Sequence, residues 1–539
     1  MVRRHRHQRH ARAAGRAGRR PRGDPPAHRI RSAGATRVVA GGGSVSLFKG
    51  QEELDLTEGG VVKPLLFLSL PIVVTNLMQT AYNLADTFWL GQYSTEALAA
   101  VSFAFPMVFL LISLGMGLSV AGSVLVAQHT GADETEEAEY AASQTFTFAF
   151  LASALLGGLG YLVVRPFLAF LGASSDVLPG ATAYMEVVAL GLPFMFGFFV
   201  FISLMRGAGD TLTPMFVMFG TVVVNVVLDP FLINGWTLLE NAPLVGTVAF
   251  PELGIQGAAI ATVFSRSLAM VVGVAIMLSG SRGIQIHLRD MVPDTQYLRK
   301  ILQIGIPASV EGTGRALSIN ALLLVVGLFS TSVVAAFGIG TRVFSVVFLP
   351  AIAVARGVET MTGQNIGAGK YDRAATANYV AAKFLFAVLG AAGVLVFFVP
   401  EPIVAAFTDD AAVLAHGTTF LRYVALSFGF IGIMRAFSGG FRGAGKTLYA
   451  AAISVLTLAV VRLPIAWVAS RGAVPTDLWF LARPDPRGIW IAFFVSNVVG
   501  ALVAWAWFSR ETWREGGVRG TPGSDGFDAE DGETPASGD

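Results

Sequence analysis

The stretch QTAYNLAD, residues 79–86, is the most informative part of the chain. It places amide and carboxylate side chains inside an apolar run that is otherwise typical of a membrane-spanning helix. On a helix, Asn76, Gln79, Asn83 and Asp86 fall at i, i+3, i+7 and i+10, so they form one polar stripe. A charged side chain at the bilayer centre costs about 2.5 to 3.5 kcal/mol on insertion scales. The stripe therefore predicts a functional site within a membrane span.

The composition around this stretch indicates a membrane protein. Of 539 residues, 54% are hydrophobic and 14% are charged, and the mean hydropathy is +0.63. Apolar runs of about 20 residues, each long enough to cross the hydrocarbon core, recur along the chain. Cysteine is absent, which excludes thiol catalysis, disulfides and iron–sulfur clusters. The predicted fold class is an all-α polytopic membrane protein with twelve transmembrane helices.

The twelve predicted spans fall into two groups of six, separated by a polar connector. They cover residues 64–90, 97–127, 138–164, 178–204, 214–236, 254–279, 299–329, 333–364, 374–400, 412–438, 448–470 and 488–509.

The two groups are sequence repeats, because several motifs recur at a constant offset of 236 residues. The matched residues are Pro71 with Pro307, Gln128 with Gln364, Gly131 with Gly367, Pro166 with Pro402, and Arg206 with Arg442. Six spans per repeat return the chain to its starting side, so the repeats are parallel and related by an axis along the membrane normal. This predicts two pseudo-symmetric six-helix lobes with a substrate path between them.

The expected domains follow from these repeats and from two charged ends. The Arg-rich start and the acidic end have no apolar face, so we expect both to be disordered. The expected divisions are a basic tail at 1–60, an N-lobe at 61–280, a cytoplasmic connector at 281–298, a C-lobe at 299–510 and an acidic tail at 511–539.

The distribution of Lys and Arg predicts the orientation. With a cytoplasmic N-terminus, the inner loops and C-terminal flank collect most of the basic residues, whereas the outer loops hold only Arg165, Arg471, Arg483 and Arg487. The positive-inside rule then places both termini in the cytoplasm of a multi-pass plasma-membrane protein.

A second polar stripe, formed by Thr221, Asn225 and Asp229 at i, i+4 and i+8, lies in the fifth predicted span. Asp229 and Asp86 both fall in the outward half of the first bundle, so they are expected to share a pocket that binds a proton or Na⁺. The predicted cation-coupling or substrate residues are Gln79, Tyr82, Asn83, Asp86, Asn225, Asp229 and Thr262, with Asp86, Asn225 and Asp229 as the candidate Na⁺ ligands. Two close carboxylates titrate as a coupled pair.

The repeat does not duplicate these acids. Adding 236 maps Asp86 onto Leu322 and Asp229 onto Ile465. The second half has other intramembrane charges instead, including Glu311 and Arg315 at i, i+4, which form either a packing ion pair or a polar patch in the C-lobe cleft.

Simpler structural roles are open for several of these residues. Asp86 could reach the outer interface, and Asp229 could end a helix before Pro230. The RGAG motifs beginning at Arg206 and Arg442 lack the P-loop pattern, and we interpret them as tight inner turns with an arginine at the lipid headgroups.

Over about residues 60 to 510 the sequence resembles the multidrug and toxic compound extrusion (MATE) family, and more particularly its prokaryotic DinF-like branch. The resemblance is carried by NLMQTAYNLADTFWLGQYSTEALAAVSFAFP, MRGAGDTLTP, NVVLDPFLINGW, GIQGAAIATVFSR, GQNIGAGK and FRGAGK. It implies two six-helix lobes facing each other in a V. It also implies N-lobe cation coupling on Gln79, Tyr82, Asp86, Asn225 and Asp229, and on Thr262.

The resemblance implies a secondary active transporter, not an enzyme, that exports organic, often cationic and amphipathic drug-like compounds by antiport with protons or Na⁺. We expect no cofactor, no nucleic-acid partner and a monomer in the bilayer. A flippase for lipid-linked sugars on a related scaffold is the alternative. It would require a strongly cationic cleft and more than twelve spans, and neither is evident from the sequence.

Overall fold

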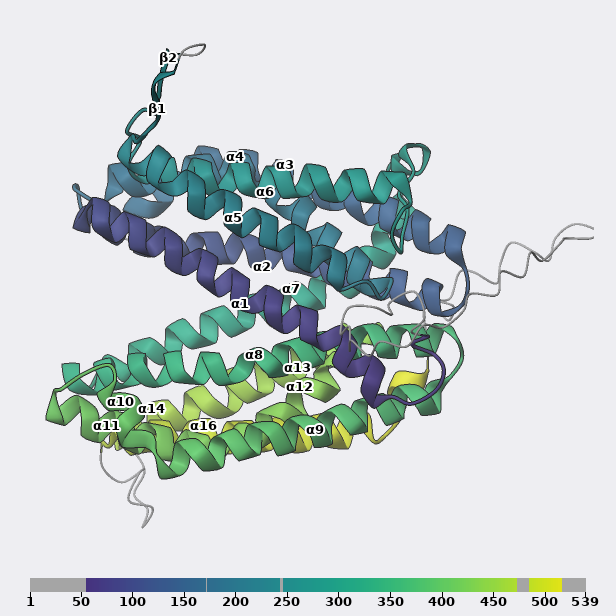
Figure 1. The fold of residues 1–539 in the computed structure, drawn as a ribbon. Helices are drawn as coiled ribbons and strands as arrows, with labels where there is room; N and C mark the ends of the chain where they lie inside the picture. The colour runs from purple at the N-terminus through teal and green to yellow at the C-terminus, as the bar shows by residue number, and fades with distance from the viewer. Residues whose placement is uncertain (1–54, 171, 243–245, 473–483, 516–539) are drawn as a thin grey trace, which may run out of the picture. The chain divides into compact units, whose positions relative to one another are not determined.

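The computed structural model describes residues 55–170, 172–242, 246–472 and 484–515 (Figure 1). The predicted basic tail up to residue 54 and the predicted acidic tail from residue 516 lie outside the described residues.

The described chain is built almost entirely of helices. The first six long helices are α1 (Val62–Tyr93), α2 (Thr95–Gly131), α3 (Thr135–Phe170), α4 (Leu178–Gly207), α5 (Leu212–Asn234) and α6 (Ile255–Ser279). After the short 3₁₀ helix η2 (Leu288–Met291), the chain continues through α7 (Thr295–Val326), α8 (Thr331–Gly367), α9 (Tyr371–Phe398), α10 (Pro400–Ala405), α11 (Ala411–Ala425), α12 (Phe428–Gly443), α13 (Thr447–Val455), η3 (Leu456–Arg462), α14 (Leu463–Arg471), α16 (Pro486–Phe508) and η4 (Thr512–Arg514).

The prediction of a twelve-helix membrane protein is confirmed, with two departures from straight spans. Among the described helices, ten are long and apolar enough to cross a membrane, and α11 with α12 adds an eleventh that is bent by 51°. The 32-residue α7 supplies the twelfth, although Glu311, Arg315 and its other charged residues lower its hydropathy. The penultimate span is continuous from α13 to α14, but its middle, η3, is a π-helix.

Helix ends and interruptions follow local chemistry. Ser94 caps α2 by accepting a hydrogen bond from the backbone N–H of Ala97 at 2.9 Å, and Asp294 caps α7 through the N–H of Gln296 at 2.8 Å. Pro230 does not end its helix: α5 continues to Asn234 and closes on Gly235 in the left-handed conformation (φ 68°). The helix-ending role considered for Asp229 is therefore wrong.

A small antiparallel hairpin, β1 (Thr237–Ala242) with β2 (Gly246–Ala249), connects α5 to α6. The sequence pattern did not predict it, because the segment is short and carries no two-residue turn of the kind that identifies hairpins. It lies at the end of α5 to which Asp229 is nearest (Figure 1).

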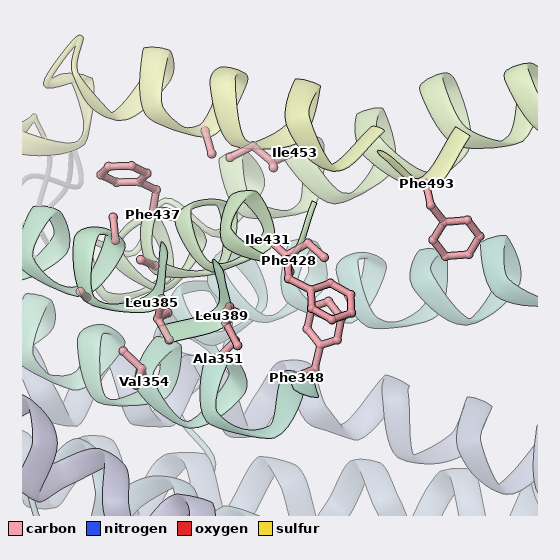
Figure 2. Packing of buried hydrophobic residues seen from close by; sticks show 14 of the residues in the cluster. Phe348, Ala351, Val354, Leu385, Leu389, Phe428, Ile431, Phe437, Ile453 and Phe493 are labelled. Atoms are coloured by element: carbon pink, nitrogen blue, oxygen red, sulfur yellow. The ribbon is translucent and has the colours of Figure 1, made fainter. Parts of the chain in front are cut away.

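The helices enclose separate hydrophobic cores for the two repeats. The larger core is contributed mainly by α8, α9, α11, α12 and α16, and Figure 2 shows Phe348, Leu385, Phe428 and other members packed together. The first repeat has its own clusters between α2, α3, α4 and α6. The first helix of each repeat crosses between them: Leu65 at the start of α1 joins the second repeat's core, and Ile301 at the start of α7 joins the first repeat's.

The two repeats meet where α2 approaches α8. A Cβ added to Gly131 would overlap the backbone carbonyl of Gln364, and one added to Gly367 would overlap that of Gln128. Both glutamines then donate across the interface: Gln128 to the carbonyl of Gly443 at 2.9 Å, and Gln364 to the carbonyl of Gly207 at 3.0 Å. The repeat-related motifs thus form a reciprocal, two-fold-like contact.

The expected boundaries of the disordered tails require correction. Residues 55–60 are packed against α8 and α9: Leu56 is buried, and its carbonyl accepts a hydrogen bond from Asn365 at 3.0 Å. At the other end, Trp513 is buried, and its indole N–H donates to the carbonyl of Phe508 at 3.0 Å. Both segments lie in strongly polar sequence, but each contributes one large apolar anchor.

The α2–α8 contact predicts the effect of a single methyl group. We expect Gly131→Ala to lower the free energy of unfolding by about 1 to 3 kcal/mol or more, since the added Cβ meets backbone atoms that cannot move away freely. The matched control is Gly158→Ala in α3, where a Cβ meets nothing within 4 Å, and which should be neutral or slightly stabilising. Thermal unfolding in detergent compares the two, and equal midpoints would contradict the proposed packing.

Candidate functional site

The predicted carboxylates of the first repeat come together from α1 and α5, with α6 beside them. Asp229 and Asn225 have no exposed surface, and the Asn225 side-chain amide donates to Asp229 Oδ1 at 3.2 Å. Thr262 Oγ1 on α6 donates to Asp86 Oδ2 at 3.4 Å. Asp86 and Asp229 lie within side-chain hydrogen-bonding reach of each other. Asp86 therefore faces the packed interior rather than the outer interface.

Several polar atoms of this cluster lack a partner. Within the described part of the chain, Asp86 Oδ1, Asp229 Oδ2, Asn225 Oδ1 and the Tyr82 hydroxyl are buried without a hydrogen bond. Buried polar groups are nearly always paired, so four unpaired oxygen atoms in one cluster point to a bound ion or proton. Carboxylate, amide and hydroxyl oxygens are the ligands that hard cations prefer. The residues present therefore fit a small cation or a shared proton.

The remaining predicted residues lie one or two turns away on α1. Gln79 donates to Asn83 Oδ1 at 3.0 Å, and Asn83 itself is exposed. Gln79 Oε1 accepts a hydrogen bond from the Arg266 guanidinium at 2.6 Å. These two amides therefore adjoin the carboxylate cluster without contacting its unpaired oxygens directly.

Arg266 on α6 is a residue of this site that the sequence pattern did not reveal. Its guanidinium lies 4.9 Å from the centre of the Tyr82 ring, and its Nε and Nη1 are buried without partners among the described residues. The available signal was its position: it follows Thr262 by one helical turn inside an apolar span. With both carboxylates ionised, Arg266 leaves the cluster with a net charge of −1, which one monovalent cation neutralises.

The described residues contain no group of three or more His, Cys, Asp or Glu side chains that could hold a metal ion. The candidate cation ligands are thus two carboxylates with an amide and a hydroxyl. A set with so few charges suits a monovalent ion better than Ca²⁺ or Zn²⁺, which usually take more carboxylates or take thiolate and imidazole ligands.

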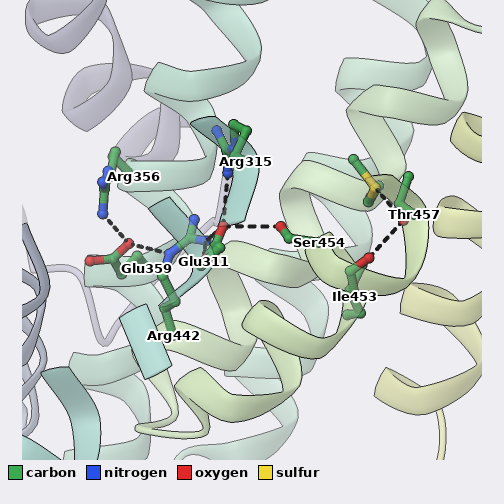
Figure 3. Close-up of polar contacts among 9 residues, drawn as sticks. Glu311, Arg315, Arg356, Glu359, Arg442, Ile453, Ser454 and Thr457 are labelled. Atoms are coloured by element: carbon green, nitrogen blue, oxygen red, sulfur yellow. Dashed lines mark hydrogen bonds and ion pairs between the residues drawn. The ribbon is translucent and has the colours of Figure 1, made fainter. Parts of the chain in front are cut away.

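Glu311 and Arg315 belong to a buried ion-pair network of the second repeat (Figure 3). Glu311 accepts hydrogen bonds from Arg315 at 3.0 Å and from Arg442 at 3.1 Å to each carboxylate oxygen. Arg442 also donates to Glu359 at 3.0 Å, and Arg356 donates to the same oxygen of Glu359 at 2.9 Å. The packing-pair interpretation of Glu311 and Arg315 is therefore supported.

The interpretation of the RGAG arginines as headgroup anchors is wrong. Arg442 is buried in the network just described, and Arg206 is buried with its guanidinium donating to Ser203 Oγ at 3.0 Å. The glycines that follow each arginine let the helix ends approach their neighbours, because a Cβ on Gly443 would overlap the carbonyl of Glu359. Sequence alone did not reveal the acidic partners, which come from distant helices.

A cavity of about 300 Å³ lies between the repeats, bordered by helices of the first bundle and by α8. Its polar lining includes Asn76, Gln79 and three arginines, Arg206, Arg266 and Arg356. No Asp or Glu is among the described residues that line it. The cavity next to the carboxylate cluster is therefore electropositive.

The comparison with known proteins agrees with this arrangement. The family model MatE matches residues 71–231 and again residues 307–468. The chain belongs to the MATE family. The two matches begin 236 residues apart, which is the repeat offset seen in the motifs. As a member of the MATE family, the chain is a multi-pass membrane transporter rather than an enzyme.

Curated relatives match most of the MATE chain. The probable multidrug resistance protein YoeA of Bacillus subtilis is 28% identical over 447 residues, covering 82% of this chain and 92% of YoeA. A FAD transporter of Shewanella oneidensis is 28% identical over 415 residues, covering 77% of this chain and 89% of its own. The multidrug export protein MepA of Staphylococcus aureus is 24% identical, with coverages of 76% and 87%.

Solved structures share the fold. An outward-facing multidrug resistance MATE transporter has a TM-score of 0.74 and 24% identity, with 85% of this chain and 97% of that chain covered. A MOP superfamily transporter from Pyrococcus furiosus, described as having a binding pocket of reverse polarity, has a TM-score of 0.73 at 24% identity, with coverages of 86% and 98%.

The buried network predicts a large cost for removing its central arginine. We expect Arg442→Met to lower the free energy of unfolding by about 3 to 5 kcal/mol, because two buried carboxylates lose a shared partner. Arg299→Met, at an exposed position near the start of α7, is the control. Thermal unfolding of both purified variants checks this, and a variant at Arg442 as stable as the control would contradict it.

Proposed function

We propose that this MATE transporter is a multidrug efflux protein that exports amphipathic organic compounds by antiport with protons or Na⁺. The observation that carries the antiport is the cluster of unpaired buried oxygens on Asp86, Asp229 and Asn225. The multidrug names of YoeA and MepA support the substrate class.

The proposed mechanism uses the two carboxylates as the coupling site. A proton would bridge the unpaired oxygens of Asp86 and Asp229, whereas Na⁺ would be held by these oxygens together with Asn225 Oδ1 and the Tyr82 hydroxyl. Antiport requires that the ion and the substrate stabilise different conformations. In this proposal, loading the site from outside disfavours the substrate-bound outward state and releases the substrate there.

The proposal also includes the setting of the protein. We infer a monomer in the plasma membrane with both termini cytoplasmic, an N-lobe at 61–280, a connector at 281–298 and a C-lobe at 299–510. The excess of Lys and Arg on one side supports this orientation. The separate hydrophobic cores of the two repeats support the lobes, although the starts of α1 and α7 each pack into the other repeat's core.

A flippase for lipid-linked sugars is the second candidate, and one observation favours it. The cavity between the repeats has three lining arginines and no lining carboxylate among the described residues, which suits a pyrophosphate group. This corrects the expectation that the cleft is not cationic. The span count still favours the efflux proposal, because the described helices account for twelve spans and not more.

Coupled export should depend on both carboxylates. Everted vesicles with an imposed proton gradient or an imposed Na⁺ gradient should export ethidium in one of the two arms. We expect Asp229→Asn and Asp86→Asn to reduce this export to the level without a gradient, because the amide can neither carry a proton nor neutralise a cation. Asp409→Asn, at an exposed loop position, should export like the unmodified protein. Normal pumping by Asp229→Asn would refute the coupling role.

Ion binding provides a test that needs no transported substrate. The net charge of −1 at the cluster predicts that purified protein takes up one monovalent cation per chain, seen as Na⁺ binding by calorimetry or as proton release or uptake on a pH change. Asp229→Asn should abolish this binding while Asp409→Asn retains it. A stoichiometry near one that is unchanged in Asp229→Asn would place the ion elsewhere.

A further inference from the structure

A second and larger cavity, of about 520 Å³, lies inside the second repeat between α7, α8, α12, η3 and α16. Its volume falls in the range of sites that hold drug-sized ligands. Its charged lining consists of Arg315, Arg342, Arg435 and Arg462. No carboxylate is among the described residues that line it, so the cavity is strongly electropositive.

Most of these arginines lack an anionic partner. Arg315 is paired with Glu311, but Arg342, Arg435 and Arg462 form no ion pair with any other described residue. The Nε of Arg435 is buried and has no hydrogen-bond partner in the part of the chain that the structure describes. Isolated charges in a low-dielectric interior are unfavourable, so this lining favours a bound anion.

Arg462 is held in a fixed orientation toward the cavity. Its Nε donates to Ser496 Oγ at 2.9 Å and its Nη2 to Asn497 Oδ1 at 2.7 Å. The guanidinium also stacks over the Phe493 ring at 4.1 Å. A guanidinium fixed by two hydrogen bonds and a ring loses little freedom when it binds an oxyanion, which is how pre-organisation raises affinity.

The wall that carries Arg462 has an unusual backbone. Residues Leu456–Arg462 form the π-helix η3, and Thr457 and Leu458 from the same turn also line the cavity. π-helical turns are rare and often occur at functional sites, because they redirect side chains that a regular helix would carry elsewhere.

The rest of the lining is aromatic. Phe337, Phe344, Phe348 and Phe493 border the cavity alongside aliphatic residues such as Ile431. Aromatic rings pack edge-to-face or offset against a flat ligand and contribute about 0.5 to 1.5 kcal/mol per pair beyond the area they bury. Arginines around a wall of phenylalanines match a ligand with an aromatic ring and an attached anionic group.

The repeat relates this cavity to the carboxylate cluster of the first repeat. Arg315 and Leu322, which line the cavity, lie 236 residues after Gln79 and Asp86. Arg462 lies 236 residues after Val226, one position from Asn225. Equivalent places in the two repeats thus carry opposite charge.

We propose that the cavity of the second repeat is the substrate-binding site and that it takes aromatic organic anions, in which a phosphate or another oxyanion is attached to one or more flat rings. This inference rests on the proposed efflux function and specifies its substrate class. The substrate anion binds in the second repeat and the coupling cation in the first. The expectation of mainly cationic substrates is replaced by one of anionic substrates at this site.

The test uses one ring with three charges. Binding of 1-naphthyl phosphate, 1-naphthol and 1-naphthylmethylammonium to the purified full-length protein is measured by naphthalene fluorescence. We expect the phosphate to bind at least tenfold more tightly than the neutral and cationic compounds. Equal affinities, or tighter binding of the cation, would overturn the proposal.

Variants place the binding in the cavity. Arg435→Gln should weaken binding of 1-naphthyl phosphate at least tenfold and leave 1-naphthol nearly unchanged. Arg422→Gln, at an exposed position of α11 outside the cavity lining, should bind like the unmodified protein. Thermal unfolding confirms that each variant is folded, and Arg342→Gln replaces Arg435→Gln if the latter does not fold. Unchanged phosphate binding in the folded cavity variant would overturn the proposal.

Two further measurements distinguish an aromatic anion from a lipid headgroup, and binding from transport. If a short-chain phosphatidylglycerol displaces 1-naphthyl phosphate and binds more tightly than it, the cavity holds a lipid headgroup and the proposal is wrong. Asp229→Asn should still bind 1-naphthyl phosphate but not transport it along an ion gradient. Retained binding with no gradient-driven transport even in the unmodified protein would count against antiport while supporting the cavity as an anion site.

Discussion

The close approach of α2 and α8 is the constraint on which the rest of the structure depends. Gly131 and Gly367 leave no room for a side chain, and Gln128 and Gln364 use the space to reach the carbonyls of the opposite repeat. In a membrane, helices associate through tight packing of small residues and through interhelical hydrogen bonds, because lipid removes the hydrophobic driving force between them. The contact therefore provides a reason for both motifs and for their repetition along the chain.

The same contact connects the motifs to the buried charges. Gly443, whose carbonyl accepts from Gln128, follows Arg442, which is bound to both Glu311 and Glu359. Arg442 is surrounded by acids from α7 and α8, so the end of α12 is fixed to both helices. A buried ion pair of this kind is weak evidence for stability but strong evidence for a specific arrangement, since each misplacement would leave a buried charge unpaired.

The sequence predicted the membrane fold, the repeat and the pairing of Asp86 with Asp229, because each depends on a pattern of residue types along one chain. It did not predict the network around Arg442 or the position of Arg266, because these depend on which side chains of different helices meet. The helix through Pro230 illustrates the limit: proline usually ends helices in water, but in α5 the helix continues to Gly235. The ordered residues 55–60 were missed for a similar reason, as one buried leucine outweighs a polar neighbourhood.

The contacts also form a continuous path between the two charged sites. Arg315 belongs both to the ion-pair network and to the wall of the arginine-lined cavity, and Ile352 of α8 borders this cavity and the one between the repeats. Arg266 and Gln79 line the latter cavity and lie beside the carboxylate cluster. Coupling between distant sites is carried by packed and hydrogen-bonded elements that have two arrangements. If opening the α2–α8 contact changes the position of Arg442, it also changes the partners of Arg315, so a cation bound in one repeat would alter the charge that faces an anion in the other.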